Sequence, residues 1–343
     1  MLTTTDSPLS PEAQTGALLA RIKEARQAIL SELRKLVVGQ DEAIDQVLIG
    51  MFAGGHLMIQ GPPGTAKTLV IVSIARIMNL EFKRIQFTPD LMPSDISGTE
   101  ILEQDPETGR RVTKFVKGPV FCNLVMADEI NRTPPKTQAS LLEVMQEKQV
   151  TISGKTHALP KPFYVMATQI SMEQEGTYPL PEAQQDRFML SIMMNYLPDN
   201  DEIAVVRHST GSAKVTLEKV IDAAELQAFV KTVRGVALPA ELGRYIVDLT
   251  ATTRPTVEGC PAFVKDYVAW GAGLRASQNL ALAAKSAAAL DGRGTVRLAD
   301  VQKVIVPVMR HRIGLSFRAE VDRVTIEDVI QKVVASISTP KGV

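Results

Sequence analysis

Short apolar runs, separated by turn residues and by stretches with helical spacing, fill the first half of the chain. Buried strands that alternate with helices in this way are typical of a parallel, doubly wound sheet, whose ligands bind at the carboxyl ends of the strands. The pattern therefore predicts an α/β fold with a five-stranded parallel sheet. Its strands are expected at residues 56–60, 82–87, 123–127, 163–168 and 188–194.

Amphipathic helical spacing precedes and follows this region. Residues 17–35 carry apolar side chains at helical spacing among charges, and a second helix is expected at 42–52, after the break at Gly39-Gln40-Asp41. The sheet pattern stops near residues 196–200, and helical periodicity punctuated by prolines follows. Helices are expected there at residues 225–233, 241–252, 273–290 and 298–306.

Two segments within the sheet region depart from simple alternation of strands and helices. Residues 99–117 have strand-like runs on both sides of Asp105-Pro106-Glu107-Thr108-Gly109, and residues 149–159 place Ser153-Gly154 between two short runs. Both patterns predict β-hairpins inserted into the sheet domain, with ordinary exposed loops as the alternative. We thus expect a flexible lead-in at 1–16, a sheet domain at 17–197 and a small all-helical domain at 198–343.

Composition narrows the classes of function. Lys plus Arg number 38 and Asp plus Glu also number 38, so the net charge does not favour nucleic acid as a partner. The two cysteines and four histidines are dispersed, which fits neither a disulfide framework nor a zinc site. No apolar run reaches the ~18 residues of a membrane span, and the first residues lack a signal pattern, so we expect a cytoplasmic protein without a transmembrane segment.

A glycine-rich segment follows the first predicted strand and opens a helical pattern, which is the context of a phosphate-binding loop. It consists of Gly61, Pro62, Pro63, Gly64, Thr65, Ala66, Lys67 and Thr68, and Leu69 follows it. Backbone N–H groups and the helix N-terminus would hold phosphates, with Lys67 reaching the β and γ oxygens and the Thr68 hydroxyl ligating Mg²⁺. ATP and Mg²⁺ are therefore the predicted cofactors.

Ala66 departs from this motif, because a glycine usually precedes the lysine. We expect its methyl group to be tolerated if the backbone keeps helical angles. A turn with a surface lysine is the alternative explanation of the whole segment.

An apolar strand that ends in two acids supplies the complementary part of the site. Asp128 would hold the Mg²⁺ shell, and Glu129 would orient and polarise the attacking water. Acid pairs at strand ends are common, but this pair follows Lys67 by about sixty residues with another strand pattern between them. The combination predicts hydrolysis of ATP.

Four longer stretches resemble the MoxR family of AAA+ ATPases. They are PSDISG at 93–98, ADEINRTPPKTQ at 127–138, LLEVMQE at 141–147 and EQEGTYPLPEAQQDRF at 173–188. The resemblance is dense over residues 37–188 and looser in the helical tail. It implies that the sheet domain is the AAA+ nucleotide-binding domain and the helical domain its lid. It also implies that the two hairpins are the helix-2 and pre-sensor inserts, facing the ring pore or one ring face.

The resemblance further implies a homo-oligomeric ring, usually hexameric, with ATP between neighbouring subunits. Arg187 would be the arginine finger that reaches the neighbour's ATP, with an ion pair to Asp186 as the alternative. Arg275 would be the sensor 2 residue that contacts the γ-phosphate in its own subunit, with an exposed helix arginine as the alternative. Arg132 is a further candidate for the intersubunit site.

The same resemblance assigns roles to three other positions. Val38 and Gly39 match the segment that packs against adenine, although core packing explains Val38 equally well. Ile170 stands where the family has the sensor 1 asparagine, and its side chain cannot hydrogen-bond to a water. Gln169 or Ser171 would then replace it, or hydrolysis would be slow.

Three functions follow from these observations. The first is a chaperone-like remodeller that matures or activates protein complexes, with a client complex and a von Willebrand factor A domain protein as the partners that the resemblance implies. The second is a nucleic-acid-translocating ring, because basic residues crowd the hairpins, although few residues (5%) are aromatic. These residues are Arg110, Arg111, Lys114, Lys117 and Lys155. The third is a nucleotide-gated assembly scaffold with weak turnover.

Overall fold

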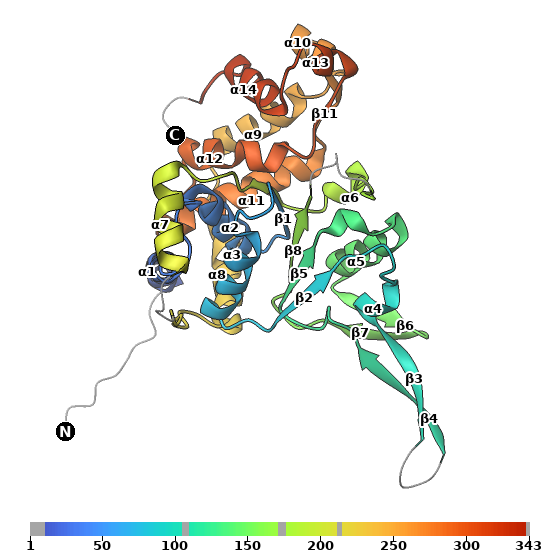
Figure 1. Cartoon of the computed structure of the whole chain (residues 1–343). Helices are drawn as coiled ribbons and strands as arrows, with labels where there is room; N and C mark the ends of the chain where they lie inside the picture. The colour runs from blue at the N-terminus through green and yellow to red at the C-terminus, as the bar shows by residue number, and fades with distance from the viewer. Residues whose placement is uncertain (1–10, 105–109, 171–175, 211–214, 341–343) are drawn as a thin grey trace, which may run out of the picture.

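A five-stranded parallel sheet forms the centre of the molecule (Figure 1). The computed structural model describes residues 11–104, 110–170, 176–210 and 215–340. The strand order is β2-β5-β8-β1-β9, and all neighbours are parallel. The five predicted strands are confirmed, with ends shifted by at most two residues. They are β1 (Leu57–Gln60), β2 (Phe82–Gln86), β5 (Leu124–Asp128), β8 (Tyr164–Gln169) and β9 (Leu190–Met193).

Successive residues of the inner strands β1, β5 and β8 enter two different cores, because side chains alternate across a sheet. In β5, Leu124 and Met126 belong to the first core, and Val125 and Ala127 belong to the second. All four are fully buried. This double burial explains why the inner strands are mostly continuous apolar runs, whereas the edge strand β2 contains the exposed Arg84 and Gln86.

Helices cover both faces of the sheet. The first core includes residues of α1 (Pro11–Leu33), α2 (Asp41–Phe52) and α3 (Lys67–Ile77), whereas α4 (Pro93–Ser97) and α5 (Pro135–Glu147) contribute to the second. Helix α1 begins at Pro11, six residues before the predicted start at 17. Proline is tolerated in a first helical turn, and residues 11–16 lack the apolar periodicity that would have signalled a helix.

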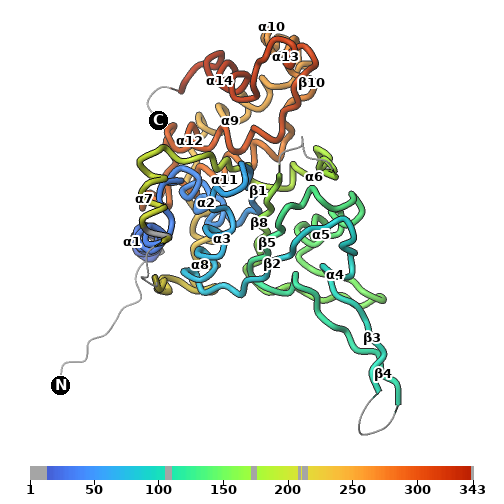
Figure 2. Tube along the Cα trace, viewed as in Figure 1, coloured from blue at the N-terminus to red at the C-terminus, as the bar shows by residue number. Residues whose placement is uncertain are grey.

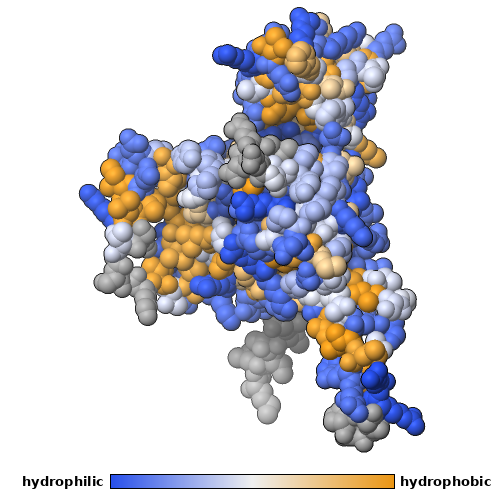
Figure 3. All heavy atoms as spheres, turned by 45° about the vertical axis from the view of Figure 1, so that its right-hand side comes forward, coloured by the Kyte–Doolittle hydropathy of each residue, from blue (hydrophilic) through white to orange (hydrophobic). Residues whose placement is uncertain are grey.

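Both predicted hairpins are present as separate antiparallel pairs. They are β3 (Gly98–Gln104) with β4 (Arg111–Lys117), and β6 (Gln149–Ile152) with β7 (Lys155–Ala158). The predicted turn at 105–109 lies outside the described residues. The first hairpin projects away from the sheet as an arm that carries both apolar and hydrophilic residues on its surface (Figures 1 and 3).

The two hairpins touch each other at the base of the arm. The Phe115 ring of β4 stacks on the His157 ring of β7, with centroids 4.2 Å apart and planes at 26°. Phe121 meets the Phe115 ring edge to face, with centroids 5.6 Å apart. This aromatic cluster ties β4 to β7, so the hairpins are one contacting unit.

The second half of the chain is mostly helical, but one small sheet corrects the prediction that it is all-helical. Strands β10 (Val268–Trp270) and β11 (Gly314–Leu315) pair antiparallel, and they are too short to leave an alternating pattern in the sequence. The helices are α7 (Asp199–Ser209), α8 (Ala223–Gly235), α9 (Ala240–Thr252), α10 (Ala262–Tyr267), α11 (Leu274–Leu290), α12 (Leu298–Met309), α13 (Phe317–Val321) and α14 (Ile326–Ser336). None of the helices in the described ranges is long and apolar enough to cross a membrane.

The C-terminal helices pack directly on the N-terminal ones. In Figure 2 the blue α2 lies beside the orange α11, and both α1 and α2 contact α11. The alanine-rich face of α11 is buried there, and the Ser286 hydroxyl donates to the carbonyl oxygen of Ile49, 2.7 Å away. The first core is therefore continuous across the boundary predicted at 197/198.

Candidate nucleotide-binding site

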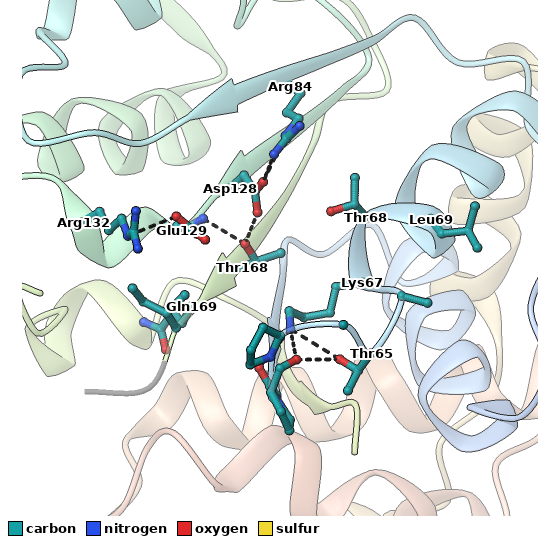
Figure 4. Close-up of a pocket in the computed structure, with 16 residues that line it drawn as sticks. Thr65, Lys67, Thr68, Leu69, Arg84, Asp128, Glu129, Arg132, Thr168 and Gln169 are labelled. Atoms are coloured by element: carbon teal, nitrogen blue, oxygen red, sulfur yellow. Dashed lines mark hydrogen bonds and ion pairs between the residues drawn. The ribbon is translucent and has the colours of Figure 1, made fainter. Parts of the chain in front are cut away.

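The loop between β1 and α3 forms one wall of a pocket of about 660 Å³ at the carboxyl ends of the strands (Figure 4). Its glycines have backbone angles that other residues rarely adopt, with φ of +143° at Gly61 and +83° at Gly64. A Cβ on Gly61 would lie 2.0 Å from the carbonyl oxygen of Met194, so only glycine fits beside β9. All of the predicted loop residues from Gly61 to Leu69 line this pocket.

Ala66 has left-handed backbone angles, with φ of 66° and ψ of 19°, at the N-cap of α3. This corrects the expectation that it tolerates its methyl group by keeping ordinary helical angles. A left-handed alanine costs about 1 to 2 kcal/mol relative to the right-handed conformation. The glycine that usually occupies this position would avoid that cost.

The Lys67 ammonium folds back into the loop. Its Nζ donates to the carbonyl oxygens of Gly61 and Pro62, at 2.9 and 2.6 Å. Burial lowers the pKa of Lys67, and the nearby carboxylates of Asp128 and Glu129 oppose that shift. The ammonium therefore lies within the loop and lines the pocket, with its donors on oxygens of Gly61 and Pro62.

Asp128 lies at the end of β5 with only 8% of its surface exposed. The Thr168 hydroxyl donates to its Oδ1 at 2.6 Å, and the Arg84 guanidinium pairs with its Oδ2 through Nε at 3.0 Å. Thr68 lies across the pocket with its hydroxyl directed toward Asp128 (Figure 4). A carboxylate facing a hydroxyl provides the hard oxygen ligands that Mg²⁺ prefers, so these residues fit the predicted metal.

Glu129 follows in a left-handed turn, with φ of 57°. Its N–H donates to the Thr168 hydroxyl at 2.9 Å, so one threonine contacts both acids. Its carboxylate accepts from Gln86 Nε2 at 3.1 Å and pairs with Arg132 Nε, also at 3.1 Å. These contacts fix the direction of the carboxylate within the pocket.

The end of β8 supplies the wall where the family's asparagine would stand. Ile170 lines the pocket, and Asn131 holds its backbone by accepting from the Ile170 N–H at 3.1 Å and donating to its carbonyl oxygen at 3.0 Å. Gln169 also lines the pocket, and its Oε1 accepts from Gln60 Nε2 at 2.6 Å. An amide therefore stands one residue before the predicted position, whereas Ser171 lies outside the described residues.

A smaller apolar hollow of about 170 Å³ adjoins the phosphate loop and shares Gly64, Thr65, Ala66 and Leu69 with the first pocket. Val38 lines this hollow, and its contact with a base stays a prediction. Gly39 has φ of +67°, and a Cβ there would lie 2.6 Å from Leu197 Cδ2, so it shapes the turn without lining the hollow.

Arg187 and Arg275 lie together, away from the phosphate loop. They line a separate pocket of about 160 Å³ with His56, Met145 and Gln146. Arg187 Nη1 donates to the carbonyl oxygen of Leu142 at 2.6 Å. The alternative ion pair between Arg187 and Asp186 is not found among the described residues.

Asp186 instead pairs with two other arginines. Arg275 Nη1 lies 2.7 Å from its Oδ2, and Arg312 Nε lies 2.7 Å from its Oδ1. Arg275 does not line the nucleotide pocket of its own subunit, because the start of α11 is held against the segment after α6 (Glu182–Gln185). Its role as the sensor 2 residue stays a prediction. Arg187 and Arg275 thus share one face.

Several pocket residues were not predicted from the sequence. Arg84 and Thr168 contact Asp128, and Gln60, Gln86 and Tyr196 contribute to the walls or to the carboxylate contacts. Three of them, Gln60, Gln86 and Thr168, lie at or near the carboxyl ends of predicted strands. The strand-end rule could therefore have identified them.

Comparisons with known proteins agree with this geometry. Residues 56–190 match the ATPase family associated with various cellular activities (AAA), and residues 262–333 match the AAA lid domain. Chaperone MoxR1 of Mycobacterium tuberculosis is 39% identical over 97% of this chain and 86% of its own length. Protein MoxR of Methylorubrum extorquens is 30% identical over 94% of this chain and 98% of its own.

A solved structure is similar as well. A candidate ATPase from Cytophaga hutchinsonii is 40% identical and superposes with a TM-score of 0.86, covering 96% of this chain and 98% of that one. The sheet order, the lid helices and these relatives agree. The chain belongs to the MoxR family of AAA ATPases.

Proposed function

We propose that this chain binds ATP with Mg²⁺ in the 660 Å³ pocket and hydrolyses it. The observation that carries the proposal is the arrangement of Lys67 in the glycine-rich loop opposite Asp128 and Glu129, which share the Thr168 hydroxyl. Phosphate oxygens would replace the carbonyl oxygens that now accept from Lys67. The base would lie in the adjoining hollow beside Val38.

Asp128 and Glu129 would have different roles in hydrolysis. Asp128 and Thr68 would hold Mg²⁺, which neutralises charge on the phosphates when it is bound. Glu129, held by Gln86 and Arg132, would accept a hydrogen bond from the attacking water and polarise it. Gln169 offers the nearest amide to help position that water, since Ile170 cannot.

The lysine provides the direct test. Lys67→Ala should bind a fluorescent ATP analogue at least about tenfold more weakly, because it removes the only ammonium in the described lining of the pocket. Lys285→Ala is the matched control, since Lys285 also donates to a backbone carbonyl oxygen, that of Arg234, but lies in α11. Unchanged affinity in Lys67→Ala would contradict the assignment.

The placement of the arginines supports action between subunits. Arg187 and Arg275 lie on a face other than the nucleotide pocket, where they would reach the ATP of a neighbouring copy. We therefore propose a homo-oligomeric ring, hexameric as in the resemblance. Sizing by light scattering with and without ATP tests this, and a monomer in both conditions would overturn it.

The work that such a ring performs is proposed from the family. We assign a chaperone-like role in the cytoplasm, in which movement of the lid against the sheet remodels a client complex, with a von Willebrand factor A domain protein as partner. The ring that translocates nucleic acid is disfavoured, because Lys114 on the arm already pairs with Glu103 at 2.9 Å. Stimulation of the ATPase rate by single-stranded DNA at physiological salt would reverse that preference.

Ile170 supports one second candidate, a scaffold that binds ATP but turns it over slowly. Ile170→Asn would restore an amide at a position that lines the pocket. A large gain in the turnover number would support impaired hydrolysis in this chain. No change would mean that Gln169 or another group already positions the water.

A further inference from the structure

A second cleft lies at the end of the sheet opposite the nucleotide pocket, where the strands begin. It has a volume of about 300 Å³ and is lined by Gly54, by α8, and by residues 159–164, which lead into the start of β8. The phosphate loop follows the carboxyl end of β1, whereas Phe163 and Tyr164 stand at the amino end of β8. Because the strands are parallel, the two sites occupy opposite ends of the sheet.

Positive charge is concentrated around this cleft. Lys148, Lys161, Lys231 and Arg234 line it, and all four are exposed. None of its described lining residues is acidic. Within the part of the chain that the structure describes, none of the four forms an ion pair, although eighteen such pairs occur elsewhere. Because the chain has zero net charge, four unpaired cations around this cleft are a local excess of positive charge.

The wall and floor are built by regular structure. On α8, Gln227, Val230, Lys231 and Arg234 follow the i, i+3, i+4, i+7 spacing of one helix face, while Leu226 and Phe229 are buried on another. Val230 is half-buried and gives this face an apolar centre. A Cβ on Gly54 would approach Val230 Cγ1 to 3.1 Å, so the glycine leaves that centre open.

The residues that line this cleft favour an acidic peptide over single-stranded nucleic acid as its ligand. Cations around an apolar floor match a peptide in which carboxylates flank an apolar side chain. Single-stranded nucleic acid needs exposed rings on which bases stack, but the aromatic residues here, Phe163 and Tyr164, are only 5% and 2% exposed. We propose that this cleft binds an acidic segment of a partner protein, with one apolar side chain of that segment seated against Val230.

A labelled peptide of about ten glutamates with a central leucine tests the proposal on the full chain. We expect binding that weakens as salt rises, and a loss of affinity of at least about tenfold in Lys161→Glu/Lys231→Glu. The matched control is Lys219→Glu/Lys265→Glu, which changes the net charge equally at exposed lysines outside the cleft and should bind as the wild type does. The basal ATPase rate should be unchanged in both variants, because none of the four lysines lines the nucleotide pocket.

Other outcomes would overturn the proposal. Equal binding of a peptide with glutamine in place of glutamate would show that the peptide's charge does not contribute to affinity. Equal losses of affinity in both double variants would show that the cleft is not the binding site. Tighter binding of a single-stranded oligonucleotide through the same two lysines would assign the site to nucleic acid. If the charge reversals impair folding, Lys161→Gln/Lys231→Gln must still weaken binding of the acidic peptide for the proposal to stand.

Discussion

The Thr168 hydroxyl contacts both acids of the proposed catalytic centre, donating to Asp128 and accepting from the Glu129 N–H. We predict that Thr168→Val, which keeps the shape of the side chain, lowers the turnover number at least about tenfold while ATP affinity changes little. Stability should fall by about 1 to 3 kcal/mol, because the buried Asp128 carboxylate loses a donor and the partly buried Glu129 N–H loses its acceptor. Steady-state kinetics and urea unfolding measure the two effects.

Thr250→Val provides the control for that variant. Thr250 is also fully buried, and its hydroxyl pairs with that of Ser277 at 2.7 Å, but it lies in α9. It should lose comparable stability and retain its turnover number. Equal kinetic losses in the two variants would show that Thr168 acts through stability alone.

Substitution of Ala66 is predicted to raise stability, whereas Thr168→Val lowers it. Ala66→Gly should raise the free energy of unfolding by about 1 kcal/mol, because glycine adopts the left-handed angles without the steric cost of a Cβ. Ala281→Gly, within the right-handed helix α11, should instead lower it by about 1 kcal/mol. Urea unfolding of both variants measures the difference, and destabilisation by Ala66→Gly would refute the strained alanine.

Among individual residues, those placed by a local sequence motif could be predicted from the sequence. Lys67 and Asp128 were found because a loop and a strand end place them, whatever the rest of the chain does. The position of Arg275 was not found, because it depends on how α11 packs against the segment carrying Asp186. Arg84 was missed because a charged residue within a strand is no signal by itself.

Among the elements, the segment that follows α12 and the segment that precedes β9 are joined by one buried cation. The Arg312 side chain is 1% exposed, pairs with Asp186, and donates to the carbonyl oxygens of Asp186, Phe188, Met189 and Val308. Burial lowers the pKa of Arg312 to about 10, and Asp186 opposes the shift, so the guanidinium stays charged at neutral pH. It therefore anchors the segment that carries Arg187 to the lid.

Arg312→Met should cost about 3 to 5 kcal/mol of stability, because it leaves buried carbonyl oxygens unpaired and removes a partner of Asp186. Arg318→Met is the control, since its pair with Asp266 is 60% and 40% exposed and should be worth less than about 1 kcal/mol. Chemical denaturation measures both. A small loss in Arg312→Met would mean that apolar packing alone holds α12 against β9.

The elements themselves were largely predictable. Short apolar runs identified the inner strands β1, β5 and β8 most clearly, since these are buried on both faces. The edge strand β2 has a weaker pattern, because Arg84 and Gln86 are exposed. The start of α1 and the pair β10 and β11 were missed, because a polar first turn and strands of three and two residues carry no periodicity.

The stability of the whole molecule should depend on pH through its buried histidines. His56 accepts from the Val165 N–H at its Nδ1 and donates from Nε2 to the carbonyl oxygen of Met145, so it is held neutral. Burial lowers its pKa from 6.5 to about 4. His311 is shifted in the same direction, mainly by burial and then by Arg312.

The direction of this pH dependence follows from proton uptake by the unfolded chain. Between about pH 6.5 and 4 the unfolded chain binds a proton at His56 that the folded chain does not, so acidification through this window lowers stability, by about 3 kcal/mol in full. Urea midpoints at pH 7, 6 and 5 should therefore fall. His56→Gln, whose amide does not titrate, should show a shallower fall, and an unchanged slope would exclude His56 as a cause.

The continuity of the first core across residues 197 and 198 has a consequence for how the molecule melts. Helices α1 and α2 pack against α11, so neither half of the chain has a complete interior of its own. Calorimetry should accordingly show a single heat-absorption peak, and fragments separated at that peptide bond should aggregate when expressed apart. Swinging of the lid would then require sliding within a shared interior, not rotation about a free linker.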